Sequence, residues 1–194
     1  MVMWFFIYEV VMKHIGLIVG HTPSSYGAKN TNMNISEFSF NNVLASDLAF
    51  KLREVGYLPT VIYRDTYSNL PEHVNSINPD IAISLHCNAF NRKTSGCEVL
   101  YYHKSTNGKR LAEALVTGIS DTLGNNNRGA KPIDYDHEGS KGDRGGWLVE
   151  KTNMPVVISE PFFIDNINEV TNAVDKQDAL VDSMVLAIKE YFGD

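Results

Sequence analysis

The feature that most constrains the fold is an alternation of short apolar segments with segments whose apolar residues recur at helical spacing. The short segments are rich in Ile, Val and Leu, which is typical of buried strands. Strands that alternate with helices predict an α/β domain, in which a twisted and mostly parallel sheet carries helices on both faces, as in phosphorylase- and hydrolase-like folds. The predicted strands are residues 14–20, 58–64, 80–86, 97–103 and 155–159.

The helical segments are identified by their apolar stripes. Between residues 37 and 55, Phe40, Leu44, Leu48 and Leu52 recur every four positions and would lie on one face of a helix. Patterns of the same kind predict helices over residues 70–77, 108–123 and 175–192, and polar, Gly-containing stretches predict loops over residues 21–35 and 125–146.

The length of the chain suits one domain. It has 194 residues with no internal repeat and no flexible linker, so we expect a single domain over residues 12–194. Residues 1–11 form either an extension upstream of a start at Met12 or an additional ordered segment. Their apolar run is interrupted at Glu9, is too short to insert into a bilayer, and lacks the basic region and cleavage site of a secretion signal. We therefore expect synthesis in the cytoplasm.

Charge and cysteine content exclude two further classes of protein. The formal net charge of −6 disfavours binding to nucleic acid, which depends on Lys and Arg side chains meeting phosphates. Cys87 and Cys97 are too few for a disulfide framework and form no CxxC motif. They are expected to be reduced thiols in the core, the alternative being that they face each other across adjoining strands.

Side chains with metal-binding or acid–base chemistry stand where three predicted strands end. His21 ends the segment GLIVGH, His86 ends IAISLH and Glu160 ends VVISE. Ligands of α/β sheets bind beyond the carboxyl ends of the strands. Glu37 opens the helix that follows the His21 loop, and the start of that helix lies at the same edge. We therefore expect these four side chains to share one cleft.

Two histidines and one carboxylate, with one position left open, are typical of a catalytic zinc site. A further glutamate outside the coordination shell can act as the general base of metal-assisted hydrolysis. Taken singly, His21 is better explained as a loop histidine, and Glu37 as an acid that favours the helix dipole. A structural zinc site is the weaker interpretation, because such sites usually fill all four positions, often with thiolates.

The order of these residues resembles that of the zinc-dependent N-acetylmuramoyl-L-alanine amidases of the Amidase_3 family. The resemblance rests on the Gly-His after the first strand, the Glu that opens the helix in SEFSFNNVLASDLAF, and the strand end SLHCNA. It continues through GCEVLYY, NNNRGAKP and MPVVISEPFFIDN, and covers roughly residues 12–192. The segment Thr22-Pro23-Ser24, where the family often has a glycine, and Pro161 after Glu160 are departures that remove no candidate ligand.

The resemblance implies Zn²⁺ bound by His21, Glu37 and His86, with Glu160 as the catalytic carboxylate. It implies an amidase catalytic domain over residues 12–194 that hydrolyses the bond between N-acetylmuramic acid and L-alanine in peptidoglycan. Without a secretion signal, such an enzyme is expected to be a phage or prophage endolysin that reaches the cell wall through a holin. The alternatives are a zinc peptidase acting within the wall peptides and a catalytically silent wall-binding module.

Three further polar residues are candidates for substrate contact. Asn88 is expected to orient either His86 or the substrate. Arg128 and Lys131 are expected either to steady an anionic peptide or a developing oxyanion, or to face solvent. Arg64 also ends a predicted strand and is expected to pack or to form an ion pair.

Overall fold

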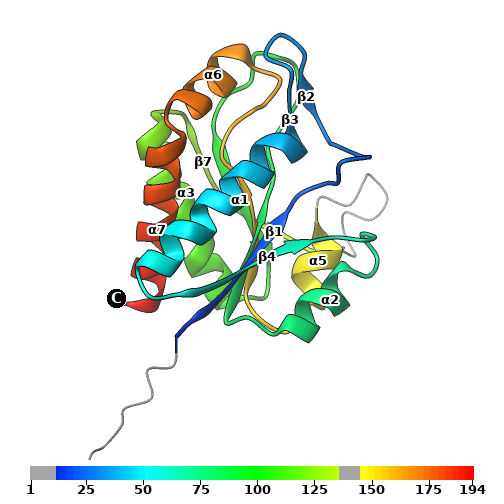
Figure 1. The fold of residues 1–194 in the computed structure, drawn as a ribbon, viewed down its shortest axis with the longest axis vertical. Helices are drawn as coiled ribbons and strands as arrows, with labels where there is room; N and C mark the ends of the chain where they lie inside the picture. The colour runs from blue at the N-terminus through cyan, green and yellow to red at the C-terminus, as the bar shows by residue number, and fades with distance from the viewer. Residues whose placement is uncertain (1–11, 136–144) are drawn as a thin grey trace, which may run out of the picture.

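The computed structural model describes residues 12–135 and 145–194. Within these ranges a six-stranded sheet lies between two layers of helices (Figure 1). The predictions made for residues 1–11, and for residues 136–144 of the charged loop, concern parts of the chain outside the described residues.

The sheet confirms the predicted fold class. Its strand order is β4–β1–β5–β8–β6–β7. The first four strands run parallel to one another, β6 and β7 are parallel to each other, and only the β8–β6 junction within this sheet is antiparallel. The strands are β1 (His14–Val19), β4 (Leu58–Tyr63), β5 (Ile81–Leu85), β6 (Cys97–Tyr102), β7 (Asn127–Ile133) and β8 (Val156–Glu160).

Helices cover both faces of this sheet because its central strands are apolar on both sides. In β1, Leu17 and Val19 face one apolar core and Ile18 faces the other, and all three are buried. The long helices, on the left in Figure 1, are α1 (Glu37–Glu54), α3 (Thr106–Leu123) and α7 (Gln177–Phe192). The shorter helices on the opposite face are α2 (Leu70–Ile77) and α5 (Gly146–Lys151).

A third group of elements lies beyond the strand ends, at the top of Figure 1. It consists of a short antiparallel pair and a helix, namely β2 (Lys29–Asn30), β3 (Ile35–Ser36) and α6 (Ile167–Asp175).

The loop predicted over residues 125–146 is wrong at β7 (Asn127–Ile133), an edge strand that pairs only with β6 within the described sheet. Gly129 and Pro132 lie within β7, and most of its side chains are partly or fully exposed, so no apolar alternation marks the strand. An edge position tolerates proline because one side of the strand needs no partner. The helix α5 was missed because it has only six residues.

The two cysteines lie in the core, as the sequence predicts. Cys87 and Cys97 are both buried and free, which confirms the expectation of reduced thiols.

In the described ranges, no helix combines the length and the apolar character needed to cross a membrane.

Candidate active site

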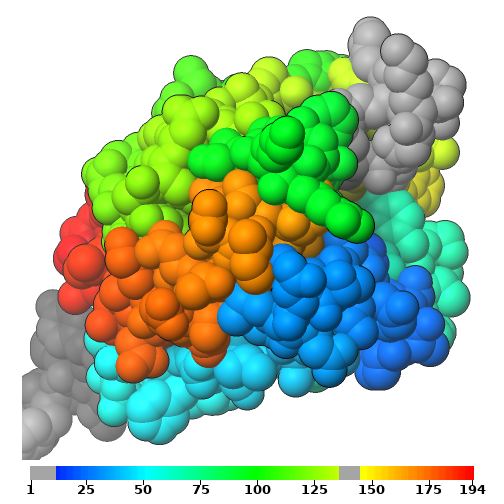
Figure 2. Space-filling model, turned by 90° about the horizontal axis from the view of Figure 1, so that it is seen from above, coloured from blue at the N-terminus to red at the C-terminus, as the bar shows by residue number. Residues whose placement is uncertain are grey.

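The segments that follow β1, β5 and β8 meet at one end of the molecule. Figure 2 views this end, with the segment after β1 in blue, the segment after β5 in green and the segment after β8 in orange. The backbone of Asn88 donates to the carbonyl oxygen of Phe162 at 2.9 Å and accepts from the N–H of Ile164 at 2.8 Å. The side-chain amide of Asn30 donates to the carbonyl oxygen of Ile164 at 3.0 Å. These bonds hold the three strand ends side by side.

His21 and His86 lie close together because the residue before His21 is a glycine, which leaves room beside the end of β5. His21 follows β1 with a φ of 67°, a left-handed conformation that is uncommon outside glycine. A Cβ atom on Gly20 would lie 2.4 Å from the carbonyl oxygen of Leu85 and 2.8 Å from the ring of His86. With glycine there, the two imidazole rings lie with their centroids 5.2 Å apart.

The first turn of α1 places Glu37 between these histidines. The hydroxyl of Ser36 accepts from the N–H of Ser39 at 3.1 Å, and the hydroxyl of Ser39 accepts from the N–H of Ser36 at 2.9 Å. This reciprocal capping satisfies two backbone donors and defines where the helix begins. Glu37 is therefore the first helical residue, with its side chain directed toward the end of β5.

The Glu37 carboxylate contacts both histidines. Its Oε1 lies 2.8 Å from Nδ1 of His86, and its Oε2 lies 3.2 Å from Nε2 of His21. The backbone N–H groups of Cys87 and Ala28 also donate to it, at 3.1 and 3.2 Å. Burial alone would raise the pKa of Glu37, but its hydrogen bonds and charge interactions with the two histidines outweigh burial and hold that pKa well below its usual range. The group is an anion at neutral pH.

These three side chains fit a zinc ion. Each offers one ligand atom, and the ligand atoms of His21, Glu37 and His86 all lie within 4.8 Å of one another. Two imidazole nitrogens and one carboxylate oxygen form a donor set typical of catalytic zinc. Elsewhere in residues 12–135 and 145–194, no three His, Cys, Asp or Glu residues converge in this way. The neighbouring Cys87 is a poor ligand, because burial and the Glu37 charge raise the pKa of its thiol.

Glu160, the last residue of β8, is held by a separate hydrogen-bond network. The side-chain amide of Asn88 donates to Oε2 of Glu160 at 2.6 Å and to Oε1 of Glu98 at 2.8 Å. Glu98 pairs directly with Glu160 across the antiparallel β6–β8 junction and is only 2% exposed. Nε of Arg128, on β7, donates to Oε2 of Glu98 at 2.9 Å. Arg128 thus balances the charge of Glu98, and the amide of Asn88 connects Glu98 to Glu160.

The candidate ligands and Glu160 line the same cleft, which has a volume of about 440 Å³. The three strand-end residues and Glu37, which the sequence singled out together, therefore meet in one place. The same cleft is also lined by apolar, aromatic and cationic side chains, among them Ile18, Arg64, Tyr67, Leu70, Leu148 and Ile158.

Residues 15–190 match the family model described as N-acetylmuramoyl-L-alanine amidase. The chain belongs to this amidase family. It is 27% identical over 188 residues to the N-acetylmuramoyl-L-alanine amidase LytC of Bacillus subtilis, an alignment that covers 93% of this chain and 35% of LytC. The chain therefore spans about a third of the length of that relative.

Solved structures show the same fold as this amidase-family domain. The N-acetylmuramoyl-L-alanine amidase from Clostridium difficile 630 has a TM-score of 0.79 and 22% identity, with 94% of this chain and 98% of that chain covered. The catalytic domain of the CD27L endolysin has a TM-score of 0.77 and 26% identity, with 92% of this chain and 97% of that chain covered.

The other candidates for substrate contact lie in different surroundings. Asn88 lines the cleft of the amidase domain, and its side chain binds Glu160 and Glu98. The Nε of Arg128 is engaged by Glu98. Lys131 lies on β7, and the described residues that line the cleft do not include it. Their contact with substrate remains a prediction.

Sequence reasoning missed Glu98 as part of the site. In the segment CEVLYY it is a single charged residue within an otherwise apolar strand. Burying a carboxylate without a partner is costly, so its isolation was the available signal. The partners could not be identified in the same way, because they come from the loop after β5 and from the unpredicted strand β7.

Proposed function

We propose that this chain is a zinc-dependent peptidoglycan hydrolase that cleaves the amide bond between N-acetylmuramic acid and the L-alanine of the stem peptide. The observation that carries the proposal is the convergence of His21, Glu37 and His86 with Glu160 in one cleft of a domain that matches the amidase family. The curated relative LytC, which is named as such an amidase, supports the choice of substrate.

In this proposal His21, Glu37 and His86 bind Zn²⁺. Zinc with three protein ligands supplies Lewis-acid polarisation of a carbonyl and acidifies a water to a pKa of about 7. Glu160 accepts the proton of the attacking water on its carboxylate and passes it to the departing amine. Asn88 restrains that carboxylate through the 2.6 Å hydrogen bond to Oε2, which keeps the base in one orientation.

The test is a digest of purified peptidoglycan, with and without a zinc chelator, analysed by mass spectrometry. We expect free stem peptides that begin with L-alanine, their loss on chelation and their return when zinc is added. Products cut within the peptide would instead make the chain a zinc peptidase. Absence of any cleavage by the zinc-loaded protein would contradict the proposal and favour a wall-binding role.

The likeness to the catalytic domain of the CD27L endolysin supports a role in cell lysis from within. We expect expression of the chain in the cytoplasm to be harmless until the membrane is permeabilised, as for an enzyme released through a holin. Lysis during expression, without permeabilisation, would contradict this role and leave the amidase activity itself untouched.

A further inference from the structure

One cation lines the cleft among the residues that the structure describes. Arg64, the residue after β4, is the only Lys or Arg among the described residues that do so. The described lining of the same cleft includes the carboxylates of Glu37 and Glu160, in a chain whose net charge is −6. A single positive side chain in such surroundings is a selective site for an anionic group on a bound substrate.

Within the described ranges, Arg64 is not engaged by any carboxylate. Ion pairs there involve other cations, and the contact recorded for the Arg64 guanidinium is the ring of Tyr67, whose centroid lies 5.8 Å away. Arg128 differs, because its Nε is bound to the buried Glu98. At this distance the ring attracts the cation, and the planar guanidinium carries N–H donors whose spacing matches a planar acceptor. A carboxylate is such an acceptor, and Arg binds it through two parallel hydrogen bonds.

The cleft that the candidate zinc ligands share with Arg64 suits an extended chain with a polar backbone. Ile18, Leu148 and Ile158 line it with apolar side chains. Ser84 also lines it, is 1% exposed, and has a hydroxyl with no hydrogen-bond partner in the described part of the structure. A buried hydroxyl without a partner is uncommon in native proteins. This hydroxyl is a polar atom within the otherwise apolar wall that Ile18, Leu148 and Ile158 form.

We propose that Arg64 binds the free carboxylate of the stem-peptide residue that follows L-alanine. This inference rests on the proposed function, because it assumes that the bond being cleaved lies at the candidate zinc ligands. Where that residue is glutamic acid linked through its side-chain carboxyl, its α-carboxylate is free. Amidation of the same group to isoglutamine removes the charge and keeps the shape. Arg64 therefore makes the enzyme selective for the acid over the amide.

The test compares two synthetic muropeptides that differ only at this group. Each carries N-acetylmuramic acid, L-alanine and a third residue, with either D-glutamic acid or D-isoglutamine in second position. Because a hydrogen bond to a charged group contributes about 1.5–3 kcal/mol, we expect kcat/KM of the zinc-loaded enzyme to be at least about tenfold higher for the acid. The inactive Glu160→Ala variant should show the same preference in equilibrium binding, where no turnover occurs.

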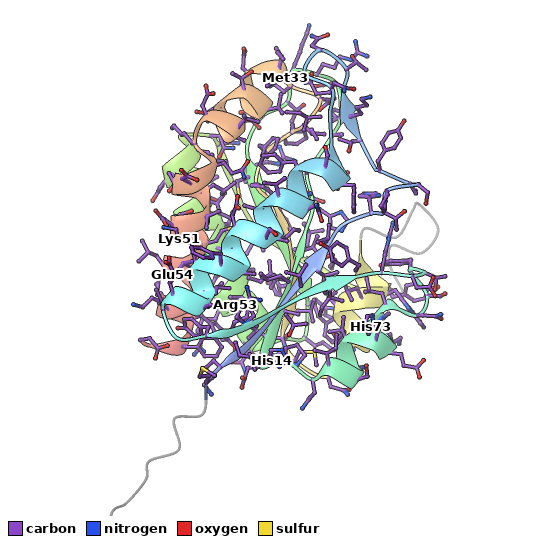
Figure 3. All side chains as sticks on the ribbon, viewed as in Figure 1. His14, Met33, Lys51, Arg53, Glu54 and His73 are labelled. Atoms are coloured by element: carbon purple, nitrogen blue, oxygen red, sulfur yellow. The ribbon has the colours of Figure 1, made fainter. Side chains whose placement is uncertain are left out.

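Arg64→Gln should abolish the preference, and Arg64→Lys should retain part of it, because the ammonium keeps the charge and loses the planar fork. The matched control is Arg53→Gln, which removes the same charge from an exposed residue in the last turn of α1. Figure 3 labels Arg53 at the end of that helix beside Lys51 and Glu54. The helical rise puts its backbone about 24 Å from that of Glu37, so the preference should be unchanged.

Three outcomes would contradict the proposal in different ways. Equal cleavage of both muropeptides by the unsubstituted enzyme would overturn the role of Arg64 and leave the amidase function standing. A preference that survives in Arg64→Gln would assign the carboxylate to another residue and also overturn it. Cleavage of neither muropeptide, with zinc bound, would overturn the proposed function itself.

Discussion

Glu37, which lines the cleft, and Glu98, which pairs with Glu160 on the neighbouring strand, are both buried carboxylates, and their partners differ. Glu37 is 5% exposed and lies between the imidazoles of His21 and His86. Glu98 is 2% exposed and lies between the amide of Asn88 and the guanidinium of Arg128. A buried carboxylate without a partner is strongly destabilising, so each of them requires compensation, and each obtains it from a different kind of group.

This difference in partners indicates that the two carboxylates have different roles, one in binding and one in positioning a neighbouring side chain. Neutral imidazoles can bind a metal ion together with a carboxylate. In the Glu37 region, a bound metal ion could therefore balance the charge of the carboxylate. A guanidinium remains protonated, so the charge of Glu98 is permanently matched within the protein. We infer that the Glu37 region is built to take up a cation, and that the Glu98 region is built to keep Glu160 in place.

The largest expected effect separates metal binding from proton transfer. His86→Ala should lose both zinc and activity, because it removes a candidate ligand. Glu160→Ala should retain zinc and lower kcat by about 10²–10⁴-fold, the usual contribution of a general base. Zinc content by metal analysis, measured with kcat on the same samples, checks both. Loss of zinc from Glu160→Ala would contradict its assignment as a base outside the coordination shell.

The next effect tests the support region. Arg128→Ala should lower kcat by about 10–100-fold at unchanged zinc content, because Glu98 and Asn88 would no longer hold Glu160 in one orientation. Arg128→Lys should recover part of the loss by restoring the charge. Steady-state kinetics on a soluble muropeptide provide the measurement. If Arg128→Ala instead raises KM at constant kcat, Arg128 contacts the substrate, as the sequence alone suggested.

A smaller effect tests how the binding region is assembled. Gly20→Ala should lower the free energy of unfolding by about 1–3 kcal/mol, because the new methyl group would meet the backbone oxygen of Leu85 and the ring of His86. Zinc affinity should fall with it. The control, Gly118→Ala within α3, meets nothing closer than 3.5 Å. This control should be neutral or stabilising by up to about 1 kcal/mol. Urea denaturation of both variants provides the comparison, and equal stabilities would contradict the crowding at Gly20.

The smallest effect concerns the thiols beside the two carboxylates. Burial, followed by nearby carboxylates, raises the pKa of both Cys87 and Cys97. Each thiol therefore stays neutral in the folded state at a pH where it would ionise in the unfolded chain. Their contribution to the free energy of unfolding should be complete below pH 9.0, the ordinary thiol pKa, and should decline above it.

Iodoacetamide at pH 8 should leave both cysteines unlabelled until denaturant is added. Rapid labelling of the native protein would contradict their burial.

The candidate zinc ligands were predictable because each stands at a position that local pattern defines. An apolar strand that ends abruptly in His21, His86 or Glu160 shows where the sheet edge lies, and parallel strands place their ends at one edge. The helix start at Glu37 is equally local, because its cap is formed by Ser36 and Ser39 only a few residues away. The strand ends and the helix start can be identified without knowing which strands are neighbours in the sheet.

The support for Glu160 was not predictable in this way. The strand β7 carries Gly129 and Pro132 and no apolar alternation, so its sequence predicts a loop and gives no sign of the ion pair between Arg128 and Glu98. The pairing of Glu98 with Glu160 depends on β6 running antiparallel to β8. A parallel arrangement, which the alternation of strands and helices favours, would have placed the start of β6 at the opposite edge.

The sequence by itself therefore determined the α/β class, the strand ends and the residues able to bind a metal, because hydrophobic periodicity and helix capping act over a few neighbouring residues. Only the tertiary structure decided which carboxylate faces which cation. It paired Arg128 with Glu98 and made Arg64 the only Lys or Arg among the described residues that line the cleft. Such pairings depend on strand order and direction, and these follow from the packing of the whole sheet rather than from any single segment.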